Sequence, residues 1–357
     1  MSIQPEPRDG GVALVTGAPG WLGTRLVESL VRGLSDVEEL AQPVPRAEVR
    51  CLVHADGDTR DLEALPGVRC IRGDLSDPDT LGRFVDGATN ATLFHCAGVI
   101  HPKRVSEFEA VNALGTRHLL AAAAAAGIRR FVHVSSNSPF GANPTPEHQF
   151  TETSPYNPYM GYGRSKMAGE QAVWKANEAG RIETVIVRAP WFYGPGQPPR
   201  QTQFFTMIRK GAFPLVGDGR NRRSMAYVDN LCQGLLLSER REQARGQAFW
   251  IADERPYSMN EILETVENVM ERDFGIAVTR KRLRLPSFAS DVARLADRAL
   301  QAVGLYEQKI HVLSEMNLTI ACSVDKARQQ LGYRPTVSLE EGMRRSLHWV
   351  MSRGITV

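Results

Sequence analysis

Tyr162 and Lys166 have the residue types and the spacing of a catalytic acid/base pair. They stand in the stretch 158–173, PYMGYGRSKMAGEQAV, and in a helix a spacing of four places both side chains on one face. A tyrosine normally ionises near pH 10, so we expect the neighbouring ammonium to lower its pKa toward the working range. Tyr159 has no such partner, because Gly163 stands four positions on. We assign Tyr159 to the wall of a substrate pocket, and an ordinary first turn of a surface helix is the alternative for the pair.

Two serines supply hydroxyl groups for the same chemistry. The sequence HVSSNSPFG places Ser135 and Ser136 where a strand expected over 129–136 ends. In an open parallel sheet, strand ends and the following helix starts face one crevice. A serine hydroxyl is therefore predicted to hold the substrate oxygen whose proton Tyr162 gives or takes.

A glycine loop near the N-terminus predicts a dinucleotide site. The sequence VALVTGAPGWLGTRLVESL places Gly17, Gly20 and Gly23 between a short β-branched run and a helical run. Such glycines permit a tight turn, close approach of a pyrophosphate and close packing of helix on sheet. The spacing is T-G-x-x-G-x-x-G, not the G-x-G-x-x-G of many dehydrogenases, and a purely structural turn is the alternative.

The adenosine end of the expected cofactor site is less defined. RGDLSD closes the third expected strand, so Asp74 is predicted to accept from the adenine amino group and Leu75 to pack on the ring. A helix cap is the alternative for Asp74. His54 stands at the end of the second strand, where a carboxylate would select NAD and an arginine NADP, and Arg60 lies further on. The sequence therefore leaves NAD and NADP equally open.

Short β-branched runs alternate with helical runs from residue 12, which predicts an α/β fold with a doubly wound parallel sheet. Strands are expected over 12–16, 48–54, 68–74, 91–98, 129–136, 182–190, 224–230 and 246–253. Helices are expected over 22–33, 78–86, 107–127 and 163–180.

The chain divides after the sixth strand. A run of Gly and Pro in 193–201 marks an excursion from the sheet. We expect a cofactor-binding domain over 1–190, to which 220–255 returns, and a smaller, mostly helical substrate lobe from 191–219 and 256–357. In this lobe, LPSFASDVARLADRALQAVGL carries apolar residues at helical spacing. It is interpreted as a lid helix packed on its own lobe, with contact to an apolar substrate or a membrane surface as alternatives.

Composition points to an ordinary globular protein. The 357 residues are 42% apolar and 23% charged, and the net charge of +3 gives no argument for a nucleic-acid or membrane partner. The five cysteines form no C-x-x-C pair, no metal-ligand cluster is visible, and buried thiols in a reducing compartment are expected. No secretory signal or run of about 20 apolar residues is present, so a cytoplasmic protein without a membrane span is expected.

Together, these motifs resemble the extended short-chain dehydrogenase/reductase family of the NAD-dependent epimerase/dehydratase type. The matching motifs, in order, are TGAPGWLG, GDL, HCAG, VNALGT, VSS, YGRSK, RAPWFYGPG and YVDN. The resemblance implies a Rossmann domain that binds NAD or NADP, a smaller C-terminal substrate lobe, and hydride transfer to or from a carbon bearing a hydroxyl or keto group. YVDN and the tail are similar to the branch that includes 3β-hydroxysteroid dehydrogenases.

The resemblance also implies roles for individual residues. Tyr162 would be the acid/base, Lys166 would bind the nicotinamide ribose, Ser136 would orient the substrate, and Asn112 would order the active-site helix and a water. The implied cofactor contacts are Gly17, Gly20, Trp21, Leu22, Gly23, His54, Asp74, Leu75, Ala97, Ser135, Tyr162, Lys166 and Pro190. The expected substrate contacts are Ser136, Asn137, Tyr159, Phe192 and Arg223.

Departures from the family pattern narrow the reaction. Asn137 and Ser138 stand where nucleotide-sugar dehydratases and decarboxylases place an acid, so elimination lacks an obvious base. Pro139 and Phe140 replace the residues of the frequent VYG motif, which removes one polar contact. Arg223 matches the arginine that binds the diphosphate in nucleotide-sugar members, with a solvated loop as the alternative.

The favoured hypothesis is an NAD(P)-dependent oxidoreductase that interconverts a secondary alcohol and a ketone on a small molecule. The alternatives are a nucleotide-sugar epimerase with tightly bound NAD and, from another class, a non-catalytic NAD(P)-binding regulator. The resemblance also implies a homodimer joined through the helices near 107–126 and 163–180.

Overall fold

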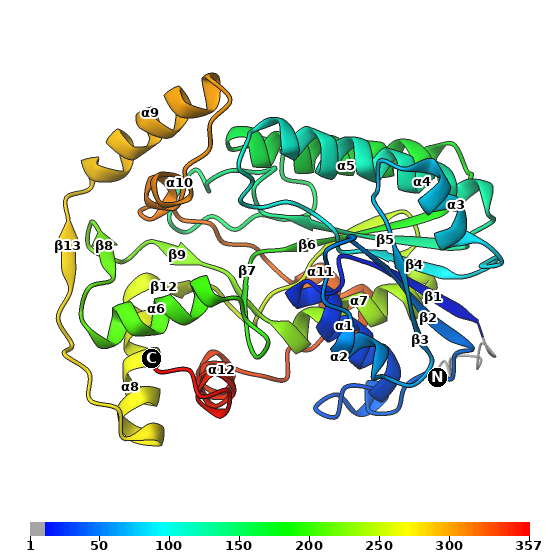
Figure 1. The fold of residues 1–357 in the computed structure, drawn as a ribbon. Coiled ribbons are helices and arrows are strands. Elements are labelled where there is room, and N and C mark those ends of the chain that lie inside the picture. Colours follow the sequence, from blue (N-terminus) through cyan, green and yellow to red (C-terminus); the bar gives the residue numbers. More distant parts are fainter. Residues whose placement is uncertain (1–10) are drawn as a thin grey trace.

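A seven-stranded parallel sheet forms the centre of the molecule (Figure 1). The computed structural model describes residues 11–357; residues 1–10, where no secretory signal is expected, lie outside the described part. The strand order is β11-β6-β5-β4-β1-β2-β3. Its strands are β1 (Val12–Thr16), β2 (Glu48–Val53), β3 (Val68–Arg72), β4 (Thr92–His95), β5 (Arg130–Ser136), β6 (Glu183–Ala189) and β11 (Gln247–Trp250).

The central strands have the burial pattern of a sheet that helices cover on both faces. They are buried along nearly their whole length, without the alternation of a half-exposed strand, and β4 and β5 include the buried polar residues His95 and His133. Chain order reverses between β1 and β4, which creates the crevice where open α/β sheets bind ligands. The predicted Rossmann-type doubly wound fold is confirmed.

Helices cover the two faces in separate layers. Figure 1 shows α3 (Pro78–Val85), α4 (Thr116–Ala125) and α5 (Met160–Glu178) on one face. On the other face, α1 (Trp21–Arg32) and α7 (Val228–Arg240) pack against the sheet, with the short α2 (Arg60–Glu63) beside them. Each layer has its own cluster of buried apolar side chains. The sheet is therefore a rigid base for the groups at its carboxyl edge.

Two sequence-based elements differ from the structure. The helix expected over 107–127 is π-helical over Phe108–Gly115 and becomes α-helical only in α4. The strand expected over 224–230 is β10 (Met225–Tyr227), and helix α7 begins directly after it. The Asp253 carboxylate explains this early end, because it accepts from the Tyr227 amide at 2.9 Å and from the Asn230 side chain at 3.0 Å.

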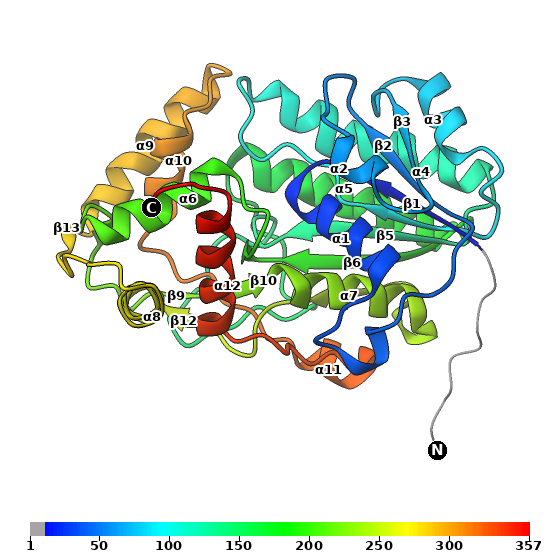
Figure 2. The ribbon, with the colours of Figure 1, turned by 60° about the horizontal axis from the view of Figure 1, so that its bottom comes forward.

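A second lobe is built around its own apolar core (Figure 2). Helices α6 (Pro199–Arg209), α8 (Met259–Phe274) and α12 (Leu339–Ser352) supply much of that core. The lobe's other helices are α9 (Phe288–Ala302) and α10 (Gln308–Glu315), whereas α11 (Asp325–Leu331) packs beside α7 against the main sheet. Its short strands are β7 (Trp191–Tyr193), β8 (Pro214–Val216), β9 (Arg222–Arg223), β10, β12 (Tyr257–Ser258) and β13 (Leu283–Leu285). The domain limits given above stay a prediction.

Within 11–357, no helix is long and apolar enough to cross a membrane. The same residues contain no cluster of three or more His, Cys, Asp or Glu that could hold a metal ion. All five cysteines are free thiols, three of them buried.

Candidate active site

The Ser136 side chain lies close enough to the Tyr162 phenol to lower the pKa of that phenol. Ser136 is the last residue of β5, and Tyr162 stands in the first turn of α5. The serine oxygen also accepts from the Ser138 amide at 3.3 Å. The end of β5 and the start of α5 thus bring together the Ser136 hydroxyl and the Tyr162 phenol, which the sequence predicted to act on the same substrate oxygen.

The loop after Ser136 docks directly on the turn that carries Tyr162. The Tyr159 amide donates to the Ser138 carbonyl at 3.0 Å. A Cβ on Gly163 would lie 2.5 Å from that same carbonyl oxygen, so only glycine permits this approach. The glycine of the motif YGRSK therefore has a packing role that fixes the distance between strand and helix.

Lys166 lies one turn beyond Tyr162 and is buried. Its Nζ donates to the Val134 carbonyl at 2.7 Å, and burial lowers its pKa to about 8. Burial raises the pKa of Tyr162 to about 12, although the nearby Ser136 side chain acts in the opposite direction. The expected lowering of the tyrosine pKa by the lysine is wrong for this arrangement, because loss of solvation outweighs every favourable contact of the phenol.

Asn112 connects the loop after β4 to helix α5. Its Oδ1 accepts from the Val99 amide at 2.8 Å, while its Nδ2 donates to the Val99 carbonyl at 2.9 Å and to Ser165 Oγ at 3.0 Å. Asn112 lies in the π-helical segment and is buried. These contacts are those of a residue that orders α5; a role in holding water stays a prediction.

A buried chain of hydrogen bonds, which sequence reasoning missed, runs beneath the site. His95 contacts Thr16 Oγ1 through Nδ1 at 2.7 Å and Thr116 Oγ1 through Nε2 at 2.9 Å. Thr116 donates its hydroxyl proton to the Asn112 carbonyl at 2.7 Å, so it must accept from His95 Nε2–H. His95 is neutral because burial lowers its pKa to about 3, and its Nδ1 then accepts from Thr16. The chain joins the glycine loop to Asn112.

The glycine loop fits an anionic pyrophosphate. Gly17 has a positive φ of 85°, and a Cβ on Gly23 would lie 2.4 Å from the Gly17 carbonyl oxygen. Helix α1 begins at Trp21 after Gly20, and no side chain caps its first amides. Those amides and the positive end of the helix are therefore available to an anion. The Leu22 side chain is buried in the core, which leaves its backbone for such a contact.

The Trp21 side chain contacts the segment that leads into the second lobe. Its indole Nε1 donates to the Pro195 carbonyl at 2.7 Å, and its ring lies 4.7 Å from that of Phe192. The indole therefore joins the glycine loop to the segment that enters the second lobe. Phe192, predicted to contact substrate, lies at this junction.

At the adenosine end, the helix-cap alternative for Asp74 is wrong. Asp77 caps α3, whereas Asp74 accepts from the Ser76 amide at 2.8 Å and from its hydroxyl at 2.6 Å. Leu75 is half-buried and His54 is exposed at the end of β2. Contacts of these residues with adenosine stay a prediction.

The remaining cofactor candidates border the carboxyl edge of the sheet. The Ala97 amide donates to Thr16 Oγ1 at 3.3 Å, and Pro190 is buried directly after β6. Ser135 Oγ is buried and has no hydrogen-bond partner within residues 11–357. An unpaired buried hydroxyl is the sort of group that a bound cofactor can satisfy.

The substrate candidates on the second lobe are held by its own helices. Arg223 donates to the Glu315 carbonyl at the end of α10, and burial lowers its pKa. Tyr159 is hydrogen-bonded to Ser314 Oγ at 2.6 Å. Asn137 accepts from the Phe140 amide through its carbonyl at 2.9 Å, and Phe140 is buried in the core where the family motif has tyrosine. Binding of substrate by these residues stays a prediction.

Several groups around Tyr162 had no signal in the sequence. The Tyr162 ring lies 5.8 Å from that of Phe108, which in turn meets Tyr306 edge-on at 5.5 Å. The charge of Glu315 raises the pKa of Tyr162, and that of Arg200 lowers it. These four residues come from four separate segments, so only the tertiary structure brings them to the phenol.

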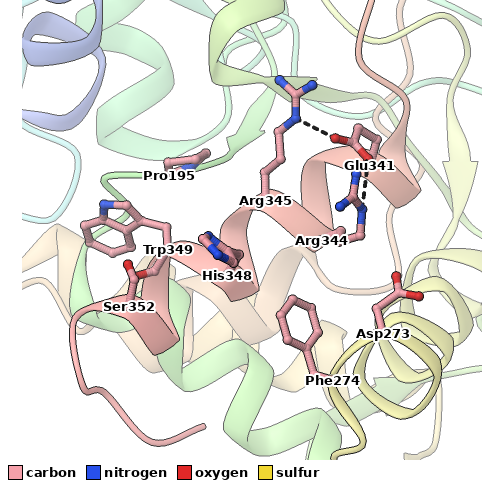
Figure 3. A pocket seen from close by; sticks show the side chains of 9 residues that line it. All are labelled: Pro195, Asp273, Phe274, Glu341, Arg344, Arg345, His348, Trp349 and Ser352. Atoms are coloured by element: carbon pink, nitrogen blue, oxygen red, sulfur yellow. Dashed lines mark hydrogen bonds and ion pairs between the residues drawn. The ribbon is translucent and has the colours of Figure 1, made fainter.

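A hollow of about 620 Å³ lies elsewhere, between α8 and α12 (Figure 3). It is lined by Arg344 and Arg345 among others, and by none of the predicted site residues. Both arginines form ion pairs with Glu341. This hollow therefore lacks the uncompensated charge that would bind an anionic ligand.

The chain is similar to known proteins over most of its length. Residues 13–252 match the model described as the NAD dependent epimerase/dehydratase family. A Sinorhizobium fredii protein, "Uncharacterized protein y4nL", is 51% identical over 355 residues, which cover 99% of each chain.

Two further relatives carry functional names. The 4-hydroxy-2-methyl-3-oxo-4-farnesyl-3,4-dihydroquinoline-1-oxide ketoreductase of Stigmatella aurantiaca is 30% identical over 333 residues, covering 92% of this chain and 93% of that protein. The crystal structure of DesIV, a dTDP-glucose 4,6-dehydratase from Streptomyces venezuelae with NAD and TYD bound, superposes with a TM-score of 0.74 at 25% identity. That match covers 96% of this chain and 98% of DesIV.

Proposed function

Because the chain belongs to the NAD dependent epimerase/dehydratase family, we propose that it is an NAD(P)-dependent oxidoreductase that interconverts a ketone and a secondary alcohol. The observation that carries the proposal is the proximity of the Ser136 hydroxyl to the Tyr162 phenol, with Lys166 one turn away. This arrangement supports a proton donor and an oxygen-orienting hydroxyl that act together at the carboxyl edge of the sheet.

The side chains of this site perform the proton transfer. With a pKa near 12, Tyr162 carries its proton at neutral pH and can donate it to the oxygen of a ketone being reduced. Ser136 holds the same oxygen by a hydrogen bond. In the reverse direction, Tyr162 must lose its proton before it accepts one from the alcohol. At neutral pH the protonated phenol is therefore ready to donate its proton in the direction of ketone reduction.

Cofactor binding is assigned to the glycine loop and the residues that follow the strands. The amides at the start of α1 would hold the pyrophosphate, and Lys166 and Ser135 would contact the nicotinamide riboside. A bound NAD or NADP supplies or accepts the hydride at the substrate carbon. The solved relative DesIV contains NAD, while the exposed His54 at the end of β2 gives this chain no reason to prefer either cofactor.

We assign the substrate to the class of ketones on a mainly apolar skeleton. The supporting relative is the ketoreductase of a farnesylated quinoline, which covers almost the whole chain. Asn137 and Ser138 supply no carboxylate after the active serine, which counts against dehydration. Phe108 and Tyr306 supply apolar surface near the phenol.

The alternative within the family is a nucleotide-sugar epimerase, and Arg223 is the feature that favours it. The guanidinium is already bonded to a backbone carbonyl, so a diphosphate would have to use its other nitrogens. NAD that copurifies with the protein, together with turnover that consumes no cofactor, would support epimerase activity.

The test is a panel of ketones on apolar skeletons, assayed by oxidation of NADH and NADPH. We expect turnover with at least one member, and Tyr162→Phe should lower kcat by about 100-fold or more while cofactor binding is unchanged. A variant that binds cofactor and retains full activity would exclude the assignment. Cofactor binding without turnover across ketones and nucleotide sugars would favour a non-catalytic regulator.

We further propose a cytoplasmic homodimer joined through the helices near 107–126 and 163–180. The first of these carries Leu114, which is 39% exposed. Gel filtration with light scattering should give twice the mass of one chain, and a monomeric mass would contradict this proposal.

A further inference from the structure

Helix α9 presents its polar side to the protein and its apolar side to solvent. The buried residues of this helix are Ser290, Ala293, Asp297 and Gln301. The stretch was expected to pack on its own lobe through its apolar stripe. That expectation is wrong, because the stripe lies on the opposite side of the helix.

The inward polar groups have partners that explain their burial. Gln301 accepts from the Gly161 amide at 2.9 Å and donates to Asp297 at 2.9 Å. Asp297 is fully buried and pairs with His311 of α10 at 2.7 Å. These contacts fix the rotation of α9, so the apolar stripe cannot turn inward without leaving buried polar groups unpaired.

The outer face is apolar over the length of the helix. Phe288 is 63% exposed, Val292 59% and Leu295 66%, at the spacing of one helical stripe. Eleven large apolar side chains are exposed within the described residues, and seven of them fall in 283–312. Figures 1 and 2 both place α9 at the outer edge of the molecule. Such clustering marks an interaction surface.

The same segment concentrates positive charge. Residues 279–312 contain seven Lys or Arg and three Asp or Glu, an excess of four, whereas the whole chain carries +3. Arg294 is paired with Asp291, and Asp297 with His311. The cations without a carboxylate partner in the described part of the chain are Lys281, Arg284, Arg298 and Lys309.

We propose that the outer face of α9 docks on an anionic lipid bilayer. An amphipathic helix inserts its apolar face at the boundary of headgroups and acyl chains, and cations on the helix and in the adjoining chain, here Arg298 on α9 with Lys281, Arg284 and Lys309 on the neighbouring segments, favour anionic lipids. A second copy of the chain is a poorer occupant, because a twofold contact would bring the two sets of cations together. Since α9 also contacts the turn that carries Tyr162, docking would place the candidate active site close to the bilayer surface.

The test is cosedimentation of the full chain with vesicles of phosphatidylglycerol and phosphatidylcholine in equal parts. We expect binding to these vesicles and little binding to vesicles of phosphatidylcholine alone. The double variant Val292→Ser/Leu295→Ser should bind at least about tenfold more weakly, because two apolar side chains no longer enter the bilayer. High salt should weaken wild-type binding.

Met351→Ser/Ile355→Ser is the matched control, since these side chains are 43% and 42% exposed in another part of the molecule. It should bind vesicles like the wild type. Thermal unfolding and cofactor binding check that both variants fold. Absence of binding by the folded wild type, or equal weakening by the control, would overturn the proposal. A dimer in solution that only the α9 variant dissociates would instead identify a second copy as the occupant.

Discussion

The side-chain oxygen of Gln301 accepts the backbone N–H of Gly161 at 2.9 Å, so helix α9 holds the turn that carries Tyr162. The preceding residue, Met160, has a positive φ of 51°, which is rare outside glycine. A Cβ on Gly161 would lie 3.0 Å from the Gln301 oxygen. The start of helix α5 thus depends on a contact from the second lobe.

Gln301→Leu should lower kcat by about tenfold while the affinity for cofactor stays unchanged, because the Gly161 amide loses its acceptor and Tyr162 is less well oriented. Gln301 is a positioning residue, so the pH profile of kcat should also shift, since the surroundings of the phenol change. Steady-state kinetics across pH would measure both effects. Loss of stability with an unchanged kcat and pH profile would assign Gln301 a structural role alone.

Tyr159→Phe should leave kcat within about threefold of the wild type, in contrast to Tyr162→Phe. Ser314 donates to the His311 carbonyl, so the Tyr159 hydroxyl is the donor to Ser314 and anchors α10. We expect a loss of about 1 kcal/mol in the free energy of unfolding, measured by urea denaturation. A loss of activity comparable with that of Tyr162→Phe would contradict the choice of tyrosine.

Asp253→Asn should flatten the pH dependence of stability. Burial raises the pKa of Asp253 from 3.8 to about 7. The folded protein therefore keeps a proton that the unfolded chain releases, so this contribution is complete below pH 3.8 and is lost as pH rises through 7. The loss amounts to about 4 kcal/mol.

Urea denaturation of both proteins at about pH 5 and about pH 8 measures this effect. Asparagine keeps an oxygen for the Tyr227 amide and lacks the charge, so the variant should be the more stable protein at the higher pH. Asp58→Asn is the control, because Arg60 lowers the pKa of the exposed Asp58 to about 2, outside this range. An unchanged pH dependence in Asp253→Asn would refute the prediction.

Arg188→Met should destabilise the protein by about 3–5 kcal/mol, because it leaves a buried carboxylate unpaired. Arg188 contacts Glu170 at 2.8 Å, and Glu170 is fully buried on α5. Denaturant unfolding measures the loss, and adding Glu170→Gln should recover part of it. Arg60→Met removes an exposed pair and should have no measurable effect. Equal effects of the two arginine variants would argue against the importance of the buried pair.

Local signals in the sequence were sufficient for the frame of the fold. β-branched runs predicted the strands of the sheet to within a few residues, because a parallel strand covered on both faces must be apolar along its length. The glycines of TGAPGWLG predicted the turn between β1 and α1, because a positive φ and a close backbone approach both require glycine at particular positions of the sequence. The π-helical segment before α4 had no such signal, since a sequence pattern can predict a helix but not which carbonyl each amide will contact.

Within the site, the sequence determined which residues lie on one face of α5 and at the end of β5, because spacing and strand ends are local properties. It could not determine the environment that sets the pKa of Tyr162, which comes from burial and from charges on distant segments such as Glu315. It likewise predicted the apolar stripe of α9, but the interpretation that this stripe packs on its own lobe was wrong. Only the tertiary structure decided the direction in which the stripe faces, because the Gly161 amide and His311 require polar partners on the inner side of the helix.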